Sequence, residues 1–301
     1  MSIHDPDITL VEVGPRDGLQ NETQTVSVET KLIFIQKLMD AGLRTIEASS
    51  FVSPRWIPQL ADHEALVSRL PFDQKNMRFP VLIPNQTGLD RALKYPIRDI
   101  AVFASATESF SKKNINCTIE ESLARFRDIT AQALEQGIRV RGYVSCTLGC
   151  PYEGKVPIPQ VVSVAKALYE AGCAEISLGD TIGVGTPYQA ANLIKAVATE
   201  IPLKQLAVHF HDTYGQALAN IFACVQEGIR IIDSAVAGLG GCPYAKGASG
   251  NVATEEVVYM LAGMGFKTGV DLTKLIEAGN YISQYLKRRN GSKVAIALGH
   301  S

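Results

Sequence analysis

The sequence predicts an α/β fold, a (β/α)8 TIM barrel followed by an extra C-terminal helical segment. Eight short runs rich in β-branched residues alternate with longer amphipathic runs, and no long linker separates them. The 301-residue length suits one such barrel, so we expect a single catalytic domain over residues 1–301. A doubly wound sheet is the alternative, but the first turn reads GPRDGLQ and lacks the Gly-x-Gly-x-x-Gly pattern expected there.

Each element follows from its own local pattern. The eight expected strands lie at 8–14, 45–51, 77–84, 99–105, 139–146, 175–180, 205–212 and 231–238. The helices expected between them lie at 29–41, 119–135, 159–171, 187–200 and 215–227, and a further helix at 271–286 follows the last strand. Several helices end at a glycine, which readily adopts the left-handed backbone of a helix C-terminus: Gly42, Gly137, Gly172 and Gly228.

Composition limits the partners of the chain. Hydrophobic residues make up 46% of it, the formal net charge is −1, and no basic block or acidic tail is present. Such a chain offers no electrostatic surface for nucleic acid or a charged membrane, so we expect a small-molecule partner. No apolar run approaches the length of a membrane span, and few residues precede the first strand, so we expect a cytoplasmic protein. A mature organelle protein that has lost its presequence would look the same.

The cysteines indicate a reducing compartment. The sequence contains no CxxC pair and no short secreted framework, so we expect free thiols at Cys117, Cys146, Cys150, Cys173, Cys224 and Cys242. Cys146 and Cys150 form a C-x3-C pattern, which is weak support for a metal site, and we expect both to be core or near-core thiols.

The residues best suited to catalysis or metal binding lie at one end of the expected barrel. Two connections are longer than a usual βα loop, one from residue 52 to about 62 and one at 239–251, within the glycine-rich stretch GLGGCPYAKGASGN at 238–251. Both follow the carboxyl end of a strand, the face on which TIM barrels carry their active sites. The other candidates also lie at such ends, and the full set is Arg16, Asp17, Glu47, Asp180, His209, His211, Cys242 and Asn251.

His209 and His211 predict a metal site. Side chains alternate along a strand, so two imidazoles that are two residues apart point to the same side, whereas Asp212 faces the other way. Asp17 can add a carboxylate, and a ligand set without thiolates suits Mg2+, Mn2+ or Zn2+ with open positions. The alternatives are two histidines satisfied within a core layer, and a structural ion pair between Asp17 and Arg16.

Two residues of the glycine-rich loop each have more than one possible role. Asn251 offers an amide oxygen to a metal, but from spacing alone we favour it as the cap of a helix that begins at Val252. Cys242 is either an inert loop thiol or an acid, base or nucleophile that a closing loop delivers, with Lys246 near enough to lower its pKa.

The remaining candidates have ordinary roles as alternatives. Glu47 and Asp180 suit helix N-caps or partners that orient the histidines, and both roles are compatible with catalysis. Lys112, Lys113 and Asn114, in SKKNIN, can meet the phosphates of a substrate, although a solvated loop is the favoured reading.

Taken in order, the motifs VGPRDGLQNE, RGYVSCTLGCPYEG, SLGDTIGVGTP, AVHFHDTYGQALAN and GLGGCPYAKGASGN resemble those of the 3-hydroxy-3-methylglutaryl-CoA lyases. This family lies within a superfamily of metal-dependent lyases and synthases built on TIM barrels. The resemblance covers nearly the whole chain and shows no departure at a motif position. RDG and HxH alone also fit the isopropylmalate synthases and 4-hydroxy-2-oxovalerate aldolases, but the cysteine loop is much more specific to the lyases.

The resemblance implies cleavage of 3-hydroxy-3-methylglutaryl-CoA to acetyl-CoA and acetoacetate, in leucine degradation or ketone-body formation, by a homodimer. It implies a divalent cation, Mg2+ or Mn2+, held by Asp17, His209, His211 and Asn251. The catalytic residues that it implies are Arg16 against the thioester carbonyl, Cys242 in proton transfer, and Asp17, Glu47, Asp180 and His209 in and around the metal site.

Three other functions fit parts of the same pattern. A lyase for a longer 3-hydroxyglutaryl-CoA would share the catalytic set and differ only in its acyl pocket. An aldolase of a free hydroxy-keto acid would need the metal and Arg16, but neither the cysteine loop nor a channel for CoA. A non-catalytic barrel that binds metal or CoA is the alternative from another class.

Overall fold

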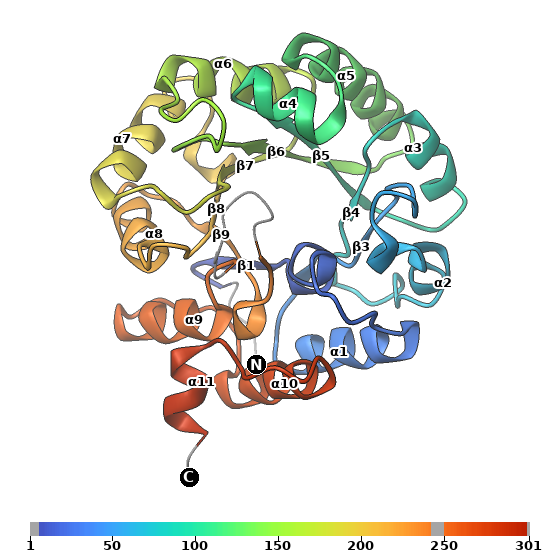
Figure 1. Cartoon of the computed structure of the whole chain (residues 1–301), viewed down its shortest axis with the longest axis vertical. Coiled ribbons are helices and arrows are strands. Elements are labelled where there is room, and N and C mark those ends of the chain that lie inside the picture. Colours follow the sequence, from blue (N-terminus) through green and yellow to red (C-terminus); the bar gives the residue numbers. More distant parts are fainter. Residues whose placement is uncertain (1–5, 242–249, 300–301) are drawn as a thin grey trace.

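The computed structural model describes residues 6–241 and 250–299, and in these residues a parallel sheet curls into a barrel inside a layer of helices (Figure 1). The strands lie in the order β2-β1-β9-β8-β7-β6-β5-β4-β3, and each pairs with its neighbours in parallel. Their bounds are β1 Thr9–Glu12, β2 Thr45–Ile46, β3 Ser49–Ser50, β4 Val81–Leu82, β5 Asp99–Ser105, β6 Arg139–Ser145, β7 Glu175–Asp180, β8 Leu206–Phe210 and β9 Ile231–Ser234.

The two edges of this sheet meet in one stretch of chain. The strands β2 and β3 are the two halves of the single strand expected at 45–51. Between them, the amide of Glu47 donates to the carbonyl of Glu12 at the end of β1 (2.9 Å), and the amide of Ala48 donates to the carbonyl of Pro80 beside β4 (3.1 Å). Because this stretch bonds to both edges, it closes the sheet, and the predicted (β/α)8 barrel is confirmed.

The long expected helices are confirmed to within a few residues at each end, and the described residues also contain short helices that the periodicity did not predict. Helices this short carry too few apolar positions to give a clear 3.6-residue pattern. The bounds are α1 Val28–Asp40, α2 His63–Val67, α3 Gln86–Ala92, α4 Glu108–Ile115, α5 Ile119–Glu135, α6 Ile158–Glu170, α7 Pro187–Val197, α8 Ala217–Gln226, α9 Thr254–Gly263, α10 Leu272–Tyr285 and α11 Lys293–Leu298.

The last expected strand ends earlier than predicted. β9 stops at Ser234, and a 3-10 turn at Val236–Gly238 follows. Two buried carboxylates explain the change, because Glu12 Oε1 accepts from the amide of Val236 (2.9 Å) and Glu255 accepts from the amide of Ala237 (3.0 Å). These amides therefore leave the strand ladder and turn the chain toward the glycine-rich loop. In contrast, the four glycines expected at helix ends all have positive φ, as predicted: Gly42, Gly137, Gly172 and Gly228.

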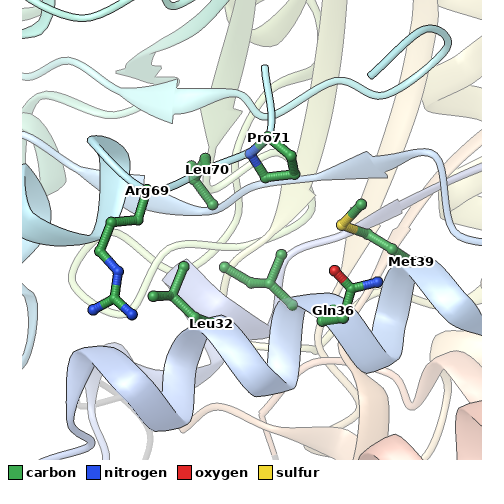
Figure 2. Close-up of a pocket in the computed structure, with 7 residues that line it drawn as sticks. Leu32, Gln36, Met39, Arg69, Leu70 and Pro71 are labelled. Carbon is green, nitrogen blue, oxygen red and sulfur yellow. The ribbon is translucent and has the colours of Figure 1, made fainter. Parts of the chain in front are cut away.

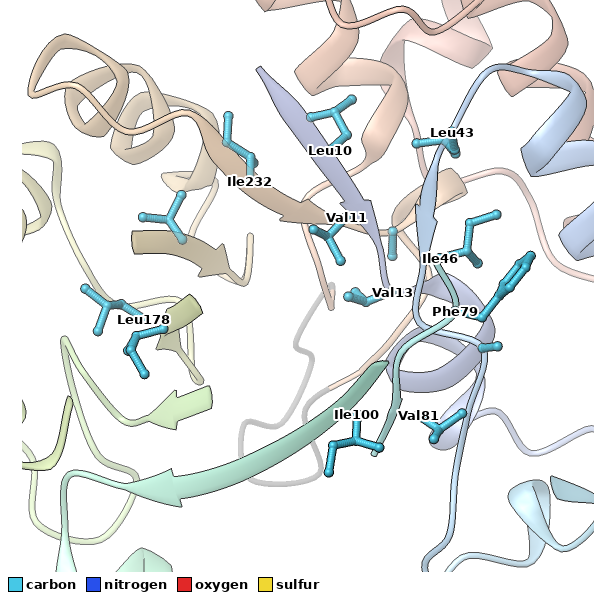
Figure 3. Packing of buried hydrophobic residues seen from close by; sticks show 14 of the residues in the cluster. Leu10, Val11, Val13, Leu43, Ile46, Phe79, Val81, Ile100, Leu178 and Ile232 are labelled. Carbon is cyan, nitrogen blue, oxygen red and sulfur yellow. The ribbon is translucent and has the colours of Figure 1, made fainter. Parts of the chain in front are cut away.

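The apolar core lies between the strands and the helices. Leu10, Val11 and Ile232 on neighbouring strands are buried, and so is Phe79 beside β4 (Figure 3). On α1 the apolar positions recur on one face, so that Phe34 is buried along with its neighbours along the helix. Within the described residues, no helix combines the length and the apolar character that a membrane crossing requires.

The interior of the barrel carries a polar network in place of a purely apolar filling. Arg141 on β6 pairs with Asp233 on β9, although β7 and β8 lie between those strands in the sheet. A contact that skips two strands has to cross the inside of the barrel. The carboxyl ends of the strands open onto the same face, so the residues that follow β1, β3 and β8 are brought together there.

Candidate metal centre

Asp17 and Arg16 are placed by a tight turn directly after β1. The chain enters a π-helix at Gly14–Gly18, and both of its end glycines are packed too closely for a side chain. A Cβ atom on Gly14 would lie 2.5 Å from Glu12 Oε1, and one on Gly18 would lie 2.7 Å from the Cβ of Leu239. The two glycines of GPRDG therefore allow this turn to pack closely against Glu12 and Leu239 at the barrel mouth.

Asp17, His209 and His211 meet at this mouth. One possible ligand atom from each lies within 4.8 Å of the others. Asp17 Oδ2 is 3.8 Å from His209 Nε2 and 4.0 Å from His211 Nε2. His209 lies near the end of β8 and His211 directly follows that strand, and both imidazoles face the same side, as the His-x-His spacing predicts. Two nitrogens and a carboxylate oxygen at this spacing form a possible metal site, and the donor set fits a divalent cation.

The surroundings keep His211 and Asp17 in the charge states that metal binding requires. Burial, together with the neighbouring His209, lowers the pKa of His211 to about 4, so this imidazole is neutral near pH 7. Burial alone would raise the pKa of Asp17, but Arg16 and the two histidines outweigh this and hold it well below its usual range. Neutral imidazoles and an ionised carboxylate are the forms that bind metal ions.

Asn251 faces the same group of residues and does not cap a helix. Its side-chain amide donates to Asp17 Oδ2 (2.8 Å) and to the carbonyl of Leu239 (3.2 Å). The helix α9 begins at Thr254 with Ala253 at its N-cap, so the cap favoured for Asn251 from spacing is wrong. The backbone stays extended for longer than expected because Asn251 pairs with His211 in an antiparallel bridge.

Arg16 joins the candidate metal centre to Glu47. Its guanidinium donates to Asp17 Oδ1 (2.8 Å) and, through Nε, to Glu47 Oε2 (2.8 Å), and the whole side chain is nearly buried. Burial alone would lower the pKa of Arg16, but the two carboxylates outweigh this and raise it. The second oxygen of Glu47, Oε1, is buried and has no hydrogen-bond partner among the described residues. A substrate hydroxyl is one group that such an oxygen can accept from.

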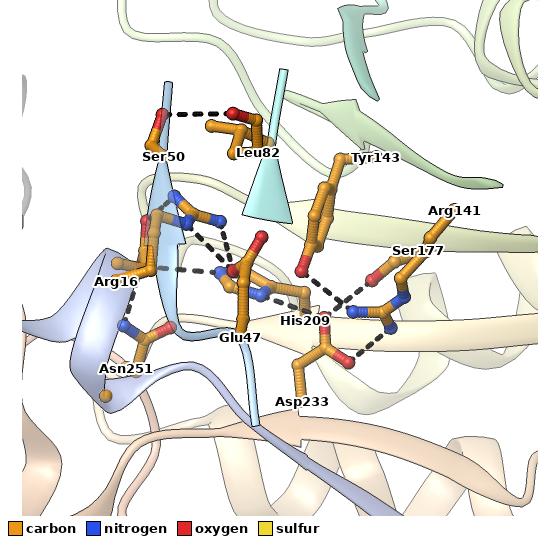
Figure 4. A network of polar contacts seen from close by, with 12 residues as sticks. Arg16, Glu47, Ser50, Leu82, Arg141, Tyr143, Ser177, His209, Asp233 and Asn251 are labelled. Carbon is orange, nitrogen blue, oxygen red and sulfur yellow. Dashed lines mark hydrogen bonds and ion pairs between the residues drawn. The ribbon is translucent and has the colours of Figure 1, made fainter. Parts of the chain in front are cut away.

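His209 also contacts a buried carboxylate, that of Asp233, which the sequence did not single out. Asp233 Oδ2 lies 3.1 Å from His209 Nδ1, and the carboxylate is held in turn by Ser177 and Arg141 (Figure 4). A signal was present in the sequence, because Asp233 and Arg141 are charged residues in the middle of buried strands. Buried charges are rare unless they are paired, so such residues indicate a partner inside the barrel.

Asp180 has a different task from the one expected. Its carboxylate accepts from the amides of Val184 (3.2 Å) and Gly185 (2.8 Å), and so fixes the loop that follows β7. It caps no helix, since α7 has Thr186 at its N-cap, and the histidine partner is Asp233. Burial raises the pKa of Asp180 to about 6, while the hydrogen bonds from the loop act in the opposite direction. Asp212, as expected, has a structural contact, since it accepts from the amide of Ala217 (3.0 Å).

Lys112, Lys113 and Asn114 are exposed to solvent, as favoured from the sequence, but the expected loop is wrong because they belong to the helix α4. The helix follows the carboxyl end of β5, and the two lysines are exposed near its last turn. The described cysteines are all free, in agreement with the sequence. Cys146 and Cys150 are buried core thiols, and Cys150 Sγ accepts from Thr107 Oγ1 (3.2 Å).

Cys242 and Lys246 lie outside the described residues, but both ends of their loop are anchored beside Asp17. The side chain of Asn21 donates to the carbonyl of Gly241 (2.9 Å). Gly250 has φ +79°, and a Cβ atom there would lie 2.2 Å from the carbonyl oxygen of Gly240. The two ends of the loop are thus in direct contact with each other and with the residues around Asp17.

The candidate centre is separate from the pocket shown in Figure 2. That pocket has a volume of about 250 Å³ and lies between α1 and the segment 69–71. It is lined by Leu32, Ile35, Gln36, Met39, Arg69, Leu70 and Pro71, and none of these is a candidate site residue. The barrel mouth, and not this outer pocket, brings the reactive side chains together.

The sequence and the fold are similar to those of hydroxymethylglutaryl-CoA lyases. The chain is 57% identical over 291 residues to the mitochondrial hydroxymethylglutaryl-CoA lyase of Arabidopsis thaliana, which covers 97% of this chain and 62% of that protein. It is 56% identical over 290 residues to the cytoplasmic 3-hydroxy-3-methylglutaryl-CoA lyase of Rattus norvegicus. This alignment covers 96% of this chain and 84% of the rat protein.

Two solved structures have nearly the same fold. The hydroxymethylglutaryl-CoA lyase of Pseudomonas aeruginosa matches with a TM-score of 0.95 and 52% identity over 98% of both chains. An HMG-CoA lyase of Acinetobacter baumannii, solved in complex with coenzyme A and 3-methylmalate, matches with a TM-score of 0.93 and 36% identity over 99% of this chain and 97% of that one. The family model described as HMGL-like matches residues 7–282. With this match and these relatives over nearly its whole length, the chain belongs to the HMGL-like family.

Proposed function

We propose that the protein is a lyase that cleaves 3-hydroxy-3-methylglutaryl-CoA into acetyl-CoA and acetoacetate. The observation that carries this proposal is the identity of 56–57%, over 96–97% of the chain, to proteins named as lyases of this substrate. The meeting of Asp17, His209 and His211 beside Arg16 supports it independently, because metal-assisted carbon–carbon cleavage needs such a set of groups. The complex of one similar lyase with coenzyme A and 3-methylmalate supports an acyl-CoA as the substrate.

The candidate metal centre would hold Mg2+ or Mn2+. Asp17, His209 and His211 are the ligands, and Asn251 completes the set if its amide turns to present oxygen in place of nitrogen. When bound, the cation lowers the pKa of a coordinated hydroxyl and neutralises the charge of a carboxylate. Structural zinc sites are closed and usually contain cysteine thiolates. A set of two histidines without a thiolate therefore argues against a structural zinc site here.

The side chains around the centre supply the proton transfers. Cleavage of the C2–C3 bond needs the C3 hydroxyl to lose its proton, and Asp17 or the unpartnered Oε1 of Glu47 would take it. His209 would act as a ligand, because Asp233 engages its Nδ1 and the cation would engage its Nε2. As the C3–oxygen bond becomes a ketone, the electron pair of the broken bond moves into the thioester and forms an enolate. Arg16 provides a fixed positive charge where this negative charge develops.

The enolate then needs a proton at C2, and Cys242 is the proposed donor. The residue lies outside the described part of the chain, so its assignment rests on its place in the sequence of the glycine-rich loop. Replacement of Cys242 by Ser should keep Mn2+ and substrate binding and remove most of the turnover, because a serine hydroxyl is a much weaker acid. Near-normal turnover in Cys242→Ser would exclude the thiol from the reaction.

Three further assignments are proposals at the same level. Lys112, Lys113 and Asn114 would meet the phosphates of CoA, in which case Lys112→Glu should raise KM with little change in kcat. A cytoplasmic location agrees with the free cysteines, although the similar lyases include both cytoplasmic and mitochondrial proteins. A homodimer is proposed from the resemblance alone, and sedimentation equilibrium would test it.

Product analysis tests the proposed function directly. The purified protein is given 3-hydroxy-3-methylglutaryl-CoA, a longer 3-hydroxyglutaryl-CoA or the free acid, each with Mn2+ and with EDTA. We expect acetyl-CoA and acetoacetate from the first ester, little product from the free acid, and no product with EDTA. A preference for the free acid would indicate an aldolase, a preference for the longer ester would indicate a related lyase, and binding without release of acetyl-CoA would indicate a non-catalytic barrel.

A further inference from the structure

His209 is held by a carboxylate on the side of its ring that faces away from Asp17. Asp233 Oδ2 lies 3.1 Å from Nδ1, while Nε2 lies 3.8 Å from Asp17 Oδ2. An ionised carboxylate can only accept hydrogen bonds, so the contact with Asp233 requires a proton on Nδ1. In the neutral imidazole, which is the form that binds metal ions, Nε2 then carries no proton, and its lone pair is directed toward Asp17 and the candidate metal centre.

Asp233 is itself fixed in place inside the barrel. Arg141 Nη2 donates to its Oδ1 (2.5 Å), and Ser177 Oγ donates to its Oδ2 (2.9 Å). Arg141 is anchored in turn by Glu175 Oε1 (2.6 Å) and by the hydroxyl of Tyr143 (2.8 Å). These residues come from β6, β7 and β9, and all of them are buried. The carboxylate therefore has little freedom to turn away from His209.

Tyr143 adds a contact to the imidazole itself. Its ring stands edge-on to the ring of His209, with centroids 5.8 Å apart and an angle of 82° between the planes. Together, Tyr143 and Asp233 limit both the tilt of the imidazole and its rotation about the ring axis. In Figure 4, Asp233, Ser177 and Arg141 lie on the side of His209 opposite Arg16.

We propose that Asp233 is a positioning residue of the candidate metal centre, which keeps His209 in the tautomer whose Nε2 can bind the metal. The proposal rests on the proposed function in that it takes His209 as a metal ligand. A purely structural role is the alternative, in which Asp233 only neutralises Arg141 and any loss of the carboxylate weakens the barrel. Carboxylates that accept from a metal-binding histidine raise its affinity for the metal, which a structural ion pair does not do.

Asp233→Asn separates these two roles. The amide has almost the same shape, and its oxygen can still accept from Arg141. Its NH2 group, placed where Oδ2 stood, would donate to His209 Nδ1 and so move the imidazole proton to Nε2. In that tautomer a hydrogen faces the metal position. Asp99→Asn is the matched control, because Asp99 is also a buried aspartate paired with an arginine, Arg78 at 2.6 Å, and within residues 6–241 and 250–299 it pairs with no histidine.

The first measurement is Mn2+ affinity in the absence of substrate, followed by electron paramagnetic resonance. Asp233→Asn should bind Mn2+ about 10- to 100-fold more weakly than the unaltered protein, whereas Asp99→Asn should bind it with unchanged affinity. Equal affinities in the unaltered protein and in Asp233→Asn, with both folded, would overturn the proposal. If the unaltered protein cleaves no CoA ester but the affinities still differ as expected, the proposed function fails and the role of Asp233 stands.

The second measurement does not depend on any variant at Asp233 being folded. In histidine-labelled, metal-free protein, 15N NMR distinguishes the two tautomers, and the signals of His209 are identified by their loss in His209→Gln. We expect a proton on Nδ1 in the unaltered protein and on Nε2 in Asp233→Asn. A proton on Nε2 of His209 in the unaltered protein would overturn the proposal, whatever the effect of the substitution on activity.

Discussion

At the scale of single residues, the structure changes the interpretation of Arg16 more than that of the other candidate residues. The sequence places it beside Asp17, and an ion pair between neighbours would be an ordinary structural feature. The structure adds Glu47, which lies between β2 and β3, the stretch that closes the barrel. One guanidinium then holds two carboxylates and is nearly buried. Its charge is fixed in place before any substrate arrives, which is the condition for electrostatic stabilisation of a developing anion.

Replacement of Arg16 by Gln should lower turnover of the CoA ester by about 100- to 1,000-fold, because the fixed charge opposite the enolate is lost. The measurement is kcat with saturating Mn2+, with thermal unfolding followed in parallel, since Glu47 and Asp17 lose a partner. Arg78→Gln is the control, because Arg78 is also an arginine paired with a buried aspartate, Asp99. A loss of turnover of less than tenfold in Arg16→Gln would exclude Arg16 as the group that stabilises the enolate.

Glu12 predicts a pH dependence of stability. It is fully buried, accepts from the amides of Gly14 and Val236 (both 2.9 Å), and contacts Thr254 Oγ1 at 2.6 Å. Burial raises its pKa to about 7, although these hydrogen bonds act in the opposite direction. Between about pH 4.5 and 7 the folded protein keeps a proton that the unfolded chain has released, so the free energy of unfolding falls as pH rises through this window.

Glu12→Gln should remove this part of the pH dependence, because the amide resembles the protonated acid and does not titrate. The effect is at most roughly 3 kcal/mol, the free energy that corresponds to a shift of two to three pKa units. Urea unfolding at pH 5 and pH 8 measures it, as the difference between the two proteins at each pH. The same change in unfolding free energy between the two pH values in both proteins would show that Glu12 is not the titrating group.

The sequence predicts residues whose chemistry depends on strand ends and misses those whose chemistry depends on partners across the barrel. Asp17, His209 and His211 were predicted because each follows directly from a strand end and from alternation along a strand. Asp233 was missed because its importance comes from His209 on another strand, and periodicity says nothing about which side chains meet. The cap role of Asn251 was wrong because spacing cannot tell how far the extended backbone runs before a helix begins.

At the scale of elements, long helices with clear caps were the most predictable. The helix α5 spans Ile119–Glu135, the same bounds as predicted, because a capping box fixes its start. Thr118 Oγ1 accepts from the amide of Glu121 (3.1 Å), and Glu121 Oε2 accepts from the amide of Thr118 (2.8 Å). The end of β9 was less predictable, because the carboxylates of Glu12 and Glu255 that turn the chain there come from distant parts of the sequence.

Thr118→Ala should lower the free energy of unfolding by about 1 kcal/mol, because the first turn of α5 loses the hydroxyl that satisfies an unpaired amide. Chemical denaturation measures the change. Thr199→Ala is a suitable control, since Thr199 is exposed and its hydroxyl donates to the carbonyl of Ala196 near the end of a helix, where it caps no N-terminal amide. Equal stabilities of the two variants would mean that the capping box contributes nothing beyond the burial of the helix.

At the scale of the whole molecule, the candidate metal centre ties together parts of the chain that are far apart in sequence. Asp17 and Asn251 are separated by 234 positions, yet their side chains are hydrogen-bonded. His209 lies on β8 and His211 directly follows that strand, whereas Asp17 lies in the π-helix after β1. With Asn251 before α9, the proposed ligands therefore come from three separate parts of the chain. We predicted a single domain over residues 1–301, and this stays a prediction. A cation at this centre would join the N-terminal and C-terminal portions of the chain.

This joining predicts that the metal stabilises the folded protein and not only the reaction. A ligand that binds only the folded state at 100 times its Kd adds about 2.7 kcal/mol to the free energy of unfolding. For a chain of 301 residues the midpoint should rise by roughly 4 °C. We therefore expect Mn2+ to raise Tm relative to EDTA in the unaltered protein, and to have little effect in His211→Ala, which keeps every strand but loses one ligand. A Tm that responds equally to Mn2+ in both proteins would place the stabilising ion at some other site. A Tm that responds in neither, at Mn2+ concentrations that support turnover, would mean that the cation arrives only with the substrate.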